Sequence, residues 1–461
     1  MADLSAAQVW GKFATGLTLA DVPEAVVARA KLHILDALGL GLAATVEEFG
    51  HSARAGIAAM AAPGPCATIL GDARWAPRDA ALLNAILMHG LDFDDTHLAS
   101  IIHPTCTALP TALALAEARD LSGAALLEAF LLGAELAIRI GGAVKGGFHH
   151  AGYHATGVVS HFASAVAAGR LLGLDAAQIA SAQGIAGSTA AGIQVFLEEG
   201  AWTKRFHPGW GAVAGISAAH LSASGFKGPT RPYEGRFGLI DTHLQAHAGE
   251  ADAAELTRAL GAEWRFGATA LKPYPVCHFI HGCADAAIAL HDEIAGAEIV
   301  AVDAFLPAPT LPIIAEPAAA KERPGTDYEA KFSAQFVTAW CLLHGRFALP
   351  DLLPAALADG KARALAQKVR CHADPDSAFP TYFSGGVRVT LADGRVLSRH
   401  VAVNSGAGDK AMTAEAVAAK FMASAELAIP AAHAARIRDA VLDLERAPAH
   451  QLAGLLRLGS V

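Results

Sequence analysis

The sequence predicts a mainly α fold: a large all-helical domain plus a smaller α+β lid domain, with C-terminal helices returning to the helical domain. Hydrophobic residues make up 53 % of the 461 residues and aromatic residues only 7 %. The apolar content therefore comes largely from Ala and Leu, which favour helix. Apolar residues recur at helical spacing up to about Ser224. After about Phe266 they occur in short alternating runs, as strands require.

The predicted helices of the first part are separated by Gly, Pro and His residues. A Gly/Pro-rich connection over 225–239 separates the last of them from the rest. They are expected at Val22–Ala44, Arg78–His89, Pro104–Ala118, Gly123–Ile140, Thr156–Leu172, Ala176–Phe196, Val213–Ser224 and Ala251–Leu260.

The later part predicts strands at Glu298–Leu306 and Ala364–His372 and a helix at Tyr328–Leu343. Alternating residues on both sides of Asp393–Gly394 predict a hairpin, because Asp-Gly suits a tight turn. From about Met412 the pattern is helical again.

A chain of this length exceeds one typical domain. The change of pattern predicts a helical domain over residues 1–265, an α+β lid domain over 266–404 and, over 405–461, helices that rejoin the first domain.

Charge and composition exclude several classes of protein. The net charge of −9 gives no electrostatic basis for nucleic-acid binding. No uncharged stretch is long enough to span a membrane, and Met1–Thr15 lacks the apolar core of a targeting signal. The six cysteines include no CxxC pair, which fits a reduced, cytoplasmic location.

The segment Leu91–Pro104 (LDFDDTHLASIIHP) is a polar island between two apolar helices. A solvated loop whose acids cap helices is one explanation. Apolar residues are interleaved with the acids, however, and this favours a functional site. Its candidate residues are Asp92, Asp94, Asp95, Thr96, His97 and His103.

A histidine is expected just before three helices. His103–Pro104 and His207–Pro208 each predict a helix start, and His154 precedes the helix near Thr156. If the three helix ends converge, they form an anion site with proton donors, because helix N-termini attract anions. Alternatively, the three starts lie apart on the surface.

Two lysines are candidate ligands of a substrate carboxylate. Lys204 and Arg205 lie in WTKRFHPG, and Lys272 lies in ALKPYPVCHFIH, which ends at His281. A lysine among aromatic and proline residues is partly desolvated, so it becomes a base or a tight carboxylate ligand. An ordinary surface position is the alternative for each.

Other motifs predict no cofactor and no metal. Gly39–Ala44 resembles a dinucleotide-binding loop but falls in a helix with no preceding strand. The aspartates of the polar island lack the second acidic cluster of a magnesium-dependent diphosphate enzyme. The spacing of His149, His150 and His154 fits no known zinc pattern.

The sequence resembles the MmgE/PrpD family, which includes 2-methylcitrate dehydratase, cis-aconitate decarboxylase and iminodisuccinate epimerase. The resemblance covers nearly the whole chain, and the order and spacing of its motifs are specific. The motifs run from Asn84 through His89 with DFDDT and His103–Pro104, then YHATGV, TKRFHPG, EGRFG, KPYPVC with His281, EAKFS and Lys420–Phe421.

The resemblance implies a cofactor-free, metal-independent enzyme, usually a homodimer, with an active site between the two domains. It implies Asp92, Thr96, His103, His154, Lys204 and Lys272 as site residues, with no assured role for His97. We expect His103 and His154 to transfer protons and Asp92 and Thr96 to orient the substrate or a histidine. The carboxylate ligands are then expected to be Lys204 and Lys272, with Arg205, His207 and His281 as further binding residues.

The leading functional hypothesis is a dehydratase acting on a small hydroxy-polycarboxylate. Within the same chemistry, a dicarboxylate epimerase or a cis-aconitate-type decarboxylase is the alternative. A magnesium-dependent enzyme acting on diphosphates and a non-catalytic acid-binding protein are more remote alternatives.

Overall fold

The computed structural model describes residues 4–460, so the first three residues of Met1–Thr15 lie outside the described part. The described residues form two compact units. The first unit contains the residues up to Phe196, Ala201–Thr269 and the residues from Thr413 onward. The second contains Leu197–Gly200 and Ala270–Met412. The sequence predicts the two domain boundaries directly after residues 265 and 404.

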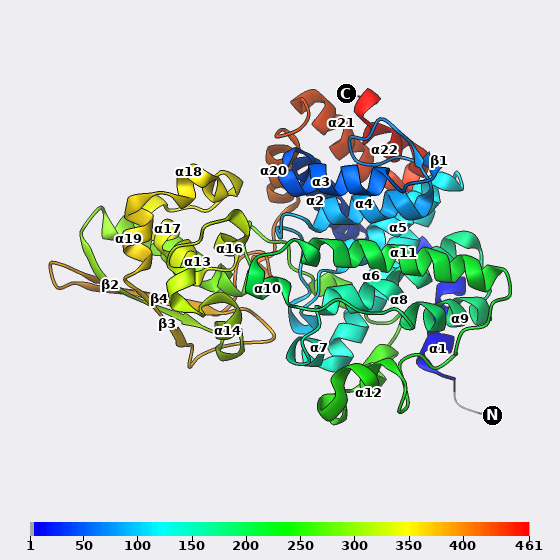
Figure 1. Cartoon of the computed structure of the whole chain (residues 1–461), viewed down its shortest axis with the longest axis horizontal. Helices are drawn as coiled ribbons and strands as arrows, with labels where there is room; N and C mark the ends of the chain where they lie inside the picture. Colours follow the sequence, from blue (N-terminus) through cyan, green and yellow to red (C-terminus); the bar gives the residue numbers. More distant parts are fainter. Residues whose placement is uncertain (1–3, 461) are drawn as a thin grey trace. The chain divides into compact units, whose positions relative to one another are not determined.

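The first unit is helical apart from a short strand, β1 (Pro63–Cys66). Figure 1 shows its long helices lying side by side, and α8 packs against α5, α6 and α11. Its helices are α1 (Ala6–Gly16), α2 (Glu24–Ala43), α3 (Glu48–Ala58), α4 (Pro77–His89), α5 (Pro104–Ala118), α6 (Gly123–Val144), α7 (Gly147–His150), α8 (Ala155–Leu172), α9 (Ala176–Gly187), α11 (Thr203–Ala223), α12 (Leu239–Leu244), α20 (Ala414–Ala425), α21 (Ala431–Leu442) and α22 (Ala449–Leu455).

Local sequence explains how these helices start and how closely they pack. Pro104 occupies the first position of α5, and the Ser122 hydroxyl caps α6 by accepting the Ala125 N–H. Gly211 and Gly215 let α11 approach α8, because a Cβ on either would lie within 2.4 Å of a serine side chain. The resulting contact places the first turns of α8 and α11 beside each other.

The C-terminal helices complete the first unit. Helix α20 packs on α2, and α22 packs on α5. The predicted mainly α fold, with a smaller α+β part and a helical C-terminal return, is therefore confirmed. Among the described residues, no helix combines the length and the apolar character needed to cross a membrane.

The second unit contains a four-stranded sheet in the order β3-β2-β4-β5. Strand β2 (Ile299–Leu306) pairs parallel to β3 (Val369–Ala373) and antiparallel to β4 (Gly385–Leu391). The hairpin from β4 to β5 (Val396–Val401) turns at the predicted Asp393–Gly394, where Gly394 has a φ of +88°. Helix α13 (His281–Ile294) packs against β4 and β5, and α17 (Ala334–His344) packs against β3.

Short helices connect the strands and packed helices of the second unit. They are α14 (Leu311–Ile314), α15 (Ala318–Lys321), α16 (Asp327–Lys331), α18 (Pro354–Leu357) and α19 (Gly360–Ala366).

Several predicted boundaries are wrong. The predicted helix at Tyr328–Leu343 is divided into α16 and α17, because the Ser333 side chain caps a new helix. The predicted strand at Ala364–His372 is half helix and half strand. Helix α9 ends at Gly187, and the short α10 (Phe196–Glu199) follows a loop. The predicted helix Ala251–Leu260 is a 3₁₀ turn over Ala253–Leu256 followed by turns, in which Ala259 adopts a φ of +49°.

Candidate active site

The polar island is a buried loop that joins α4 to α5. A backbone hydrogen bond from His97 N–H to Ile102 O closes it at 2.8 Å. Asp92 and Ile101 both have a φ of +52°, which is a rare conformation for a β-branched residue such as Ile101. Strain of this kind persists where the surroundings enforce it, and it is concentrated at functional sites. The solvated-loop explanation is therefore wrong, since the acids of the loop are buried.

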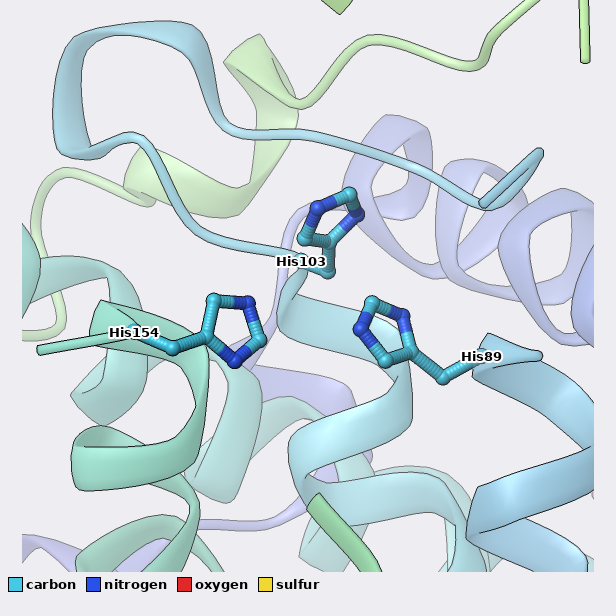
Figure 2. A group of neighbouring side chains, drawn as sticks. All are labelled: His89, His103 and His154. Carbon is cyan, nitrogen blue, oxygen red and sulfur yellow. The ribbon is translucent and has the colours of Figure 1, made fainter. Parts of the chain in front are cut away.

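Three histidine rings meet below this loop, and Figure 2 shows them facing a common space. His89 ends α4, His103 precedes α5 and His154 precedes α8. The His89 ring centroid is 4.7 Å from that of His103 and 5.8 Å from that of His154. Three helix ends therefore bring ionisable rings from distant parts of the chain into one cluster.

Asp94 connects two of these histidines. Its Oδ2 accepts a 2.7 Å hydrogen bond from His89 Nδ1, and its Oδ1 lies 3.3 Å from His103 Nδ1. Burial raises the pKa of Asp94, but its contacts with His103 and His89 outweigh burial and hold that pKa well below its usual range. Asp94 is therefore an anion that orients both rings.

Asp92 and Lys204 extend the cluster on the other side of His103. Lys204 Nζ donates a 2.9 Å hydrogen bond to Asp92 Oδ1, which also lies 3.9 Å from His103 Nε2. All of these side chains are buried. The order Lys204, Asp92, His103, Asp94, His89 thus alternates acids with bases across the cluster.

His154 contacts His207 rather than an acid. Their Nδ1 atoms are 3.0 Å apart. The predicted helix start at His207–Pro208 is wrong, because α11 begins at Thr203 and Pro208 lies inside it. Pro208 is past the first turn of α11, so the helix continues through it without the N–H that would bond to the Lys204 carbonyl. Two of the three predicted histidine-led helix starts therefore exist, at α5 and α8.

Burial keeps several of these histidines uncharged. It lowers the pKa of His89 and of His154, and it lowers that of His207 to about 4. The His89 ring therefore donates Nδ1–H to Asp94 as a neutral imidazole. Its buried Nε2 has no hydrogen-bond partner among the described residues. A neutral imidazole with an unpartnered nitrogen is chemically a base.

Asp95 points away from this cluster. Its Oδ2 accepts hydrogen bonds from His33 Nδ1 at 2.7 Å and from the Thr105 hydroxyl at 2.5 Å. Its Oδ1 accepts the Thr105 N–H at 3.3 Å in the first turn of α5. This acid already occupies part of the N-terminus of α5, so that helix end offers less to an external anion than the sequence suggests.

The remaining predicted residues of the first unit have different surroundings. Thr96 is buried in the loop, and its hydroxyl has no hydrogen-bond partner among the described residues. His97 Nδ1 lies 2.9 Å from the Ser100 hydroxyl, and burial lowers the pKa of His97 to about 4. The Arg205 guanidinium stacks on the Phe49 ring at 4.0 Å.

Lys272 and His281 belong to the second unit. Lys272 is 1 % exposed. His281 Nε2 lies 3.3 Å from Val276 O, and its ring centroid is 4.3 Å from that of His278. The Asn404 amide lies 2.9 Å from His278 Nε2. Lys272 and His281 are the two site residues that the sequence predicts in the later domain.

Several groups in the first unit have the donor atoms of a metal site. One ligand atom each from His89, His103 and His154 lies within 4.8 Å of the others, and Asp92, Asp94 and His103 form a similar set. From the sequence, the aspartates of the polar island are considered for magnesium and the run from His149 to His154 for zinc, but neither of these two sets is. The expected metal independence therefore stays a prediction.

The sequence alone assigns no role to His89, and it indicates Asp94 only as a member of the polar island. Both were visible in the sequence, since His89 ends a predicted helix directly before the polar island. Their pairing was not, because a helix end and a loop with unusual backbone angles turn the two side chains toward each other.

A buried cluster of alternating acids and bases on helix ends is the arrangement of an acid–base enzyme. Family models agree with this class. Residues 9–251 match the MmgE/PrpD N-terminal domain, and residues 274–446 match the MmgE/PrpD C-terminal domain. The chain belongs to the MmgE/PrpD family, as the resemblance predicted.

Curated relatives cover most of the chain. A cis-aconitate decarboxylase-like protein from Aspergillus oryzae is 28 % identical over 94 % of this chain and 92 % of its own length. Human cis-aconitate decarboxylase is 28 % identical over 89 % of this chain and 85 % of its own length. A cis-aconitate decarboxylase from Aspergillus terreus is 27 % identical over 59 % of this chain and 58 % of its own length. The chain is thus an enzyme of the MmgE/PrpD family.

Proposed function

We propose that the chain is a cofactor-free lyase that moves a proton at a carbon next to a carboxylate of a small polycarboxylate. The observation that carries the proposal is the buried series Lys204, Asp92, His103, Asp94 and His89. It combines a cation for a substrate carboxylate with histidines held by an acid in a fixed orientation. Such groups stabilise the charge that develops on carboxylate oxygens as the proton moves.

His103 and His154 are the proposed proton-transfer groups. Both rings face the common space in Figure 2, and Asp94 and His207 hold their other sides. Lys204 and Lys272 are the proposed carboxylate ligands, and Asp92 and Thr96 orient the substrate or His103. Arg205, His207 and His281 were expected to bind substrate directly. The contact between His207 and His154 instead favours a role for His207 in holding the His154 ring.

Two lyase reactions fit this arrangement. In a 2-methylcitrate-type dehydration, a base takes the proton next to a carboxylate and an acid protonates the leaving hydroxyl, which departs as water. In a cis-aconitate-type decarboxylation, a carbon–carbon bond breaks, CO₂ leaves and an acid delivers a proton to carbon. The names of the relatives favour decarboxylation as the second candidate. An iminodisuccinate-type epimerisation would need the same two proton-transfer groups on opposite faces of one carbon.

One experiment separates these reactions. The purified protein is incubated in heavy water with 2-methylcitrate, cis-aconitate or iminodisuccinate, and the products are followed by NMR. We expect turnover of at least one acid. A decarboxylation or an epimerisation places a solvent deuterium on carbon, whereas a dehydration removes the substrate proton and leaves no deuterium on carbon in the product. No turnover of any small polycarboxylate, or a decarboxylated or epimerised product without deuterium, contradicts the proposal.

The charge of the site predicts the substrate class. A di- or tricarboxylate offers one carboxylate to each lysine, whereas a monoester loses the charged contact with one of them. Removing one partner of a buried charge pair commonly costs about 2–5 kcal/mol, so a monoester should bind at least about tenfold more weakly. Equal affinity of tricarboxylate and monocarboxylate analogues, measured by calorimetry, contradicts this assignment.

We further propose a homodimer in the cytoplasm. The six cysteines are all free, which is typical of a reduced compartment. On α11, Phe206 and Trp210 are 41 % and 44 % exposed beside a cavity of about 360 Å³ lined by Phe49, Ile57 and Trp202. Exposed aromatic residues around an apolar cavity favour an interface. Light scattering coupled to gel filtration tests the homodimer. The mass of two chains is expected, and the mass of one chain contradicts it.

A further inference from the structure

His207 makes an unusual contact for a buried side chain. Its Nδ1 lies 3.0 Å from Nδ1 of His154, and both rings are at least nine-tenths buried. A neutral imidazole carries one proton, so a hydrogen bond between two Nδ1 atoms needs that proton on only one of them. The contact therefore couples the protonation of the two rings.

The backbone around this pair leaves room for the contact. A Cβ on Gly157 would lie 2.9 Å from His207 Cβ, and a Cβ on Gly192 would lie 3.1 Å from His207 Nδ1. Gly192 has a φ of +133°, and its carbonyl accepts the His154 N–H at 2.7 Å. Two glycines thus allow α8, α11 and the loop before α10 to bring the rings into contact.

We propose that His207 is a positioning residue that fixes which ring nitrogen of His154 carries the proton. This inference rests on the proposed role of His154 in proton transfer. When His154 donates from Nδ1 to His207, its Nε2 is a bare base. When His207 donates instead, His154 carries its proton on Nε2 and is an acid.

Burial, and after it the neighbouring basic side chains, lower the pKa of His154 and keep a second proton off the pair. His89 from α4, His103 before α5 and Lys204 from α11 all disfavour a positive charge there, in addition to His207 itself. Burial likewise lowers the pKa of His207 to about 4. At neutral pH the pair therefore shares a single Nδ1 proton. When His154 Nε2 accepts a proton from substrate, its Nδ1–H continues to donate to His207, which stabilises the imidazolium that forms.

The test compares two variants. His207→Phe fills the space but removes the nitrogen partner of His154, whereas His207→Asn retains a polar group near the position of Nδ1. We expect His207→Phe to lower kcat by roughly 100-fold with KM changed less than about threefold, and His207→Asn to recover most of kcat. His220→Asn, on an exposed position of the same helix, is the matched control.

A readout without turnover separates this inference from the proposed function. Two-bond ¹H–¹⁵N spectra of histidine-labelled protein report which nitrogen of His154 is protonated. The signals of His154 are assigned by their loss in His154→Gln. We expect one dominant tautomer in the wild type and in His207→Asn, and mixed tautomers in His207→Phe. An unchanged His154 tautomer together with an unchanged pH profile of kcat in folded His207→Phe overturns the inference. Full activity of His154→Gln overturns the proposed role of His154 instead.

Discussion

Asp94 and Asp95 are neighbours in the chain, and each accepts a 2.7 Å hydrogen bond from Nδ1 of a buried histidine. Asp94 faces His89 and His103, whose rings open on a shared space. Asp95 faces His33, and it also binds the first turn of α5 through Thr105. Equal contacts therefore fit two purposes: under the proposed function Asp94 orients the groups that react, whereas Asp95 holds the loop to the helices beneath it.

The same distinction applies to two lysines of the first unit whose side chains are less than a tenth exposed. Lys204 pairs with Asp92 beside His103. Lys420 pairs with Asp36 at 2.8 Å, donates to Phe93 O at 2.7 Å and lies over the Phe93 ring. Lys420 thus holds the loop from the Asp95 side, while Lys204 borders the histidine cluster. Burial alone does not identify a functional lysine, but its neighbours do.

The largest expected effect is that of Asp94→Asn. An amide cannot accept from both histidines, since one of its two atoms donates, so one ring adopts the wrong tautomer. We expect kcat to fall by roughly 100- to 10,000-fold with the fold retained. Steady-state kinetics and circular dichroism measure both. A folded Asp94→Asn with nearly normal kcat would remove the difference between the two aspartates.

Lys272→Ala tests whether a lysine of the second unit takes part in the reaction, as proposed for the groups that Asp94 orients. A lysine that neutralises a substrate carboxylate contributes about 2 kcal/mol or more, so kcat/KM should fall on the order of 30-fold or more. Lys361→Ala, an exposed lysine of the same unit, is the control. Equal activity of the two variants would exclude Lys272 from the site. A structure of the enzyme with a bound polycarboxylate would place it directly.

Asp95→Asn should affect stability more than catalysis. The variant weakens the hydrogen bonds to His33 and Thr105 and leaves part of a buried network unsatisfied, which costs about 1–3 kcal/mol of unfolding free energy. We expect kcat to change by less than about tenfold. Urea unfolding followed by circular dichroism measures the loss of unfolding free energy, and steady-state kinetics measure kcat. If Asp95→Asn lost as much activity as Asp94→Asn, the two acids would share one role.

A buried histidine outside the cluster gives a pH test. His161 in α8 bonds to Gly157 O, and burial lowers its pKa to about 4. Unfolded, it titrates near 6.5. Between these two pKa values, His161 binds a proton in the unfolded chain but not in the folded one. The contribution of His161 to the free energy of unfolding is therefore complete above about pH 6.5 and is lost as the pH falls toward 4.

His161→Phe should therefore flatten the acid side of the stability curve. We expect the wild type to lose up to about 3 kcal/mol more than the variant between pH 6.5 and 4. Thermal unfolding at a series of pH values, with exposed His220→Phe as the control, measures the difference. Parallel curves for wild type and His161→Phe would contradict the assignment of a depressed pKa to this ring.

The long helices are predicted well where residues that start or end a helix accompany the apolar pattern, even though α5 and α8 are buried on nearly every side. Helix α5 has the predicted bounds, and the histidines before α5 and α8 lie where the sequence places them. Periodicity failed where a side chain or a backbone angle decides the structure. Ser333 starts a new helix inside an apolar run, and α11 continues through Pro208.

The candidate site residues are visible in the sequence, but their pairing is not. His154 and His207 are 53 residues apart, and glycines on α8 and in the loop before α10 permit their contact. The pairing of Asp94 with His89 depends on a loop that begins with a left-handed residue, Asp92. Neither feature has a periodic signature, because both are decided by the packing of whole helices.

The smallest expected effect is that of metal removal, which should leave activity unchanged. His89, His103 and His154 offer ligand atoms within 4.8 Å of one another, so they have the composition of a zinc site. A metal bound there would occupy the nitrogens that proton transfer requires, so the two roles exclude each other. Assays after exhaustive chelation, and again after adding zinc, iron or magnesium, distinguish them. Activity that disappears on chelation and returns with one metal would assign the three histidines to metal binding, and Asp94 would then orient ligands rather than proton carriers.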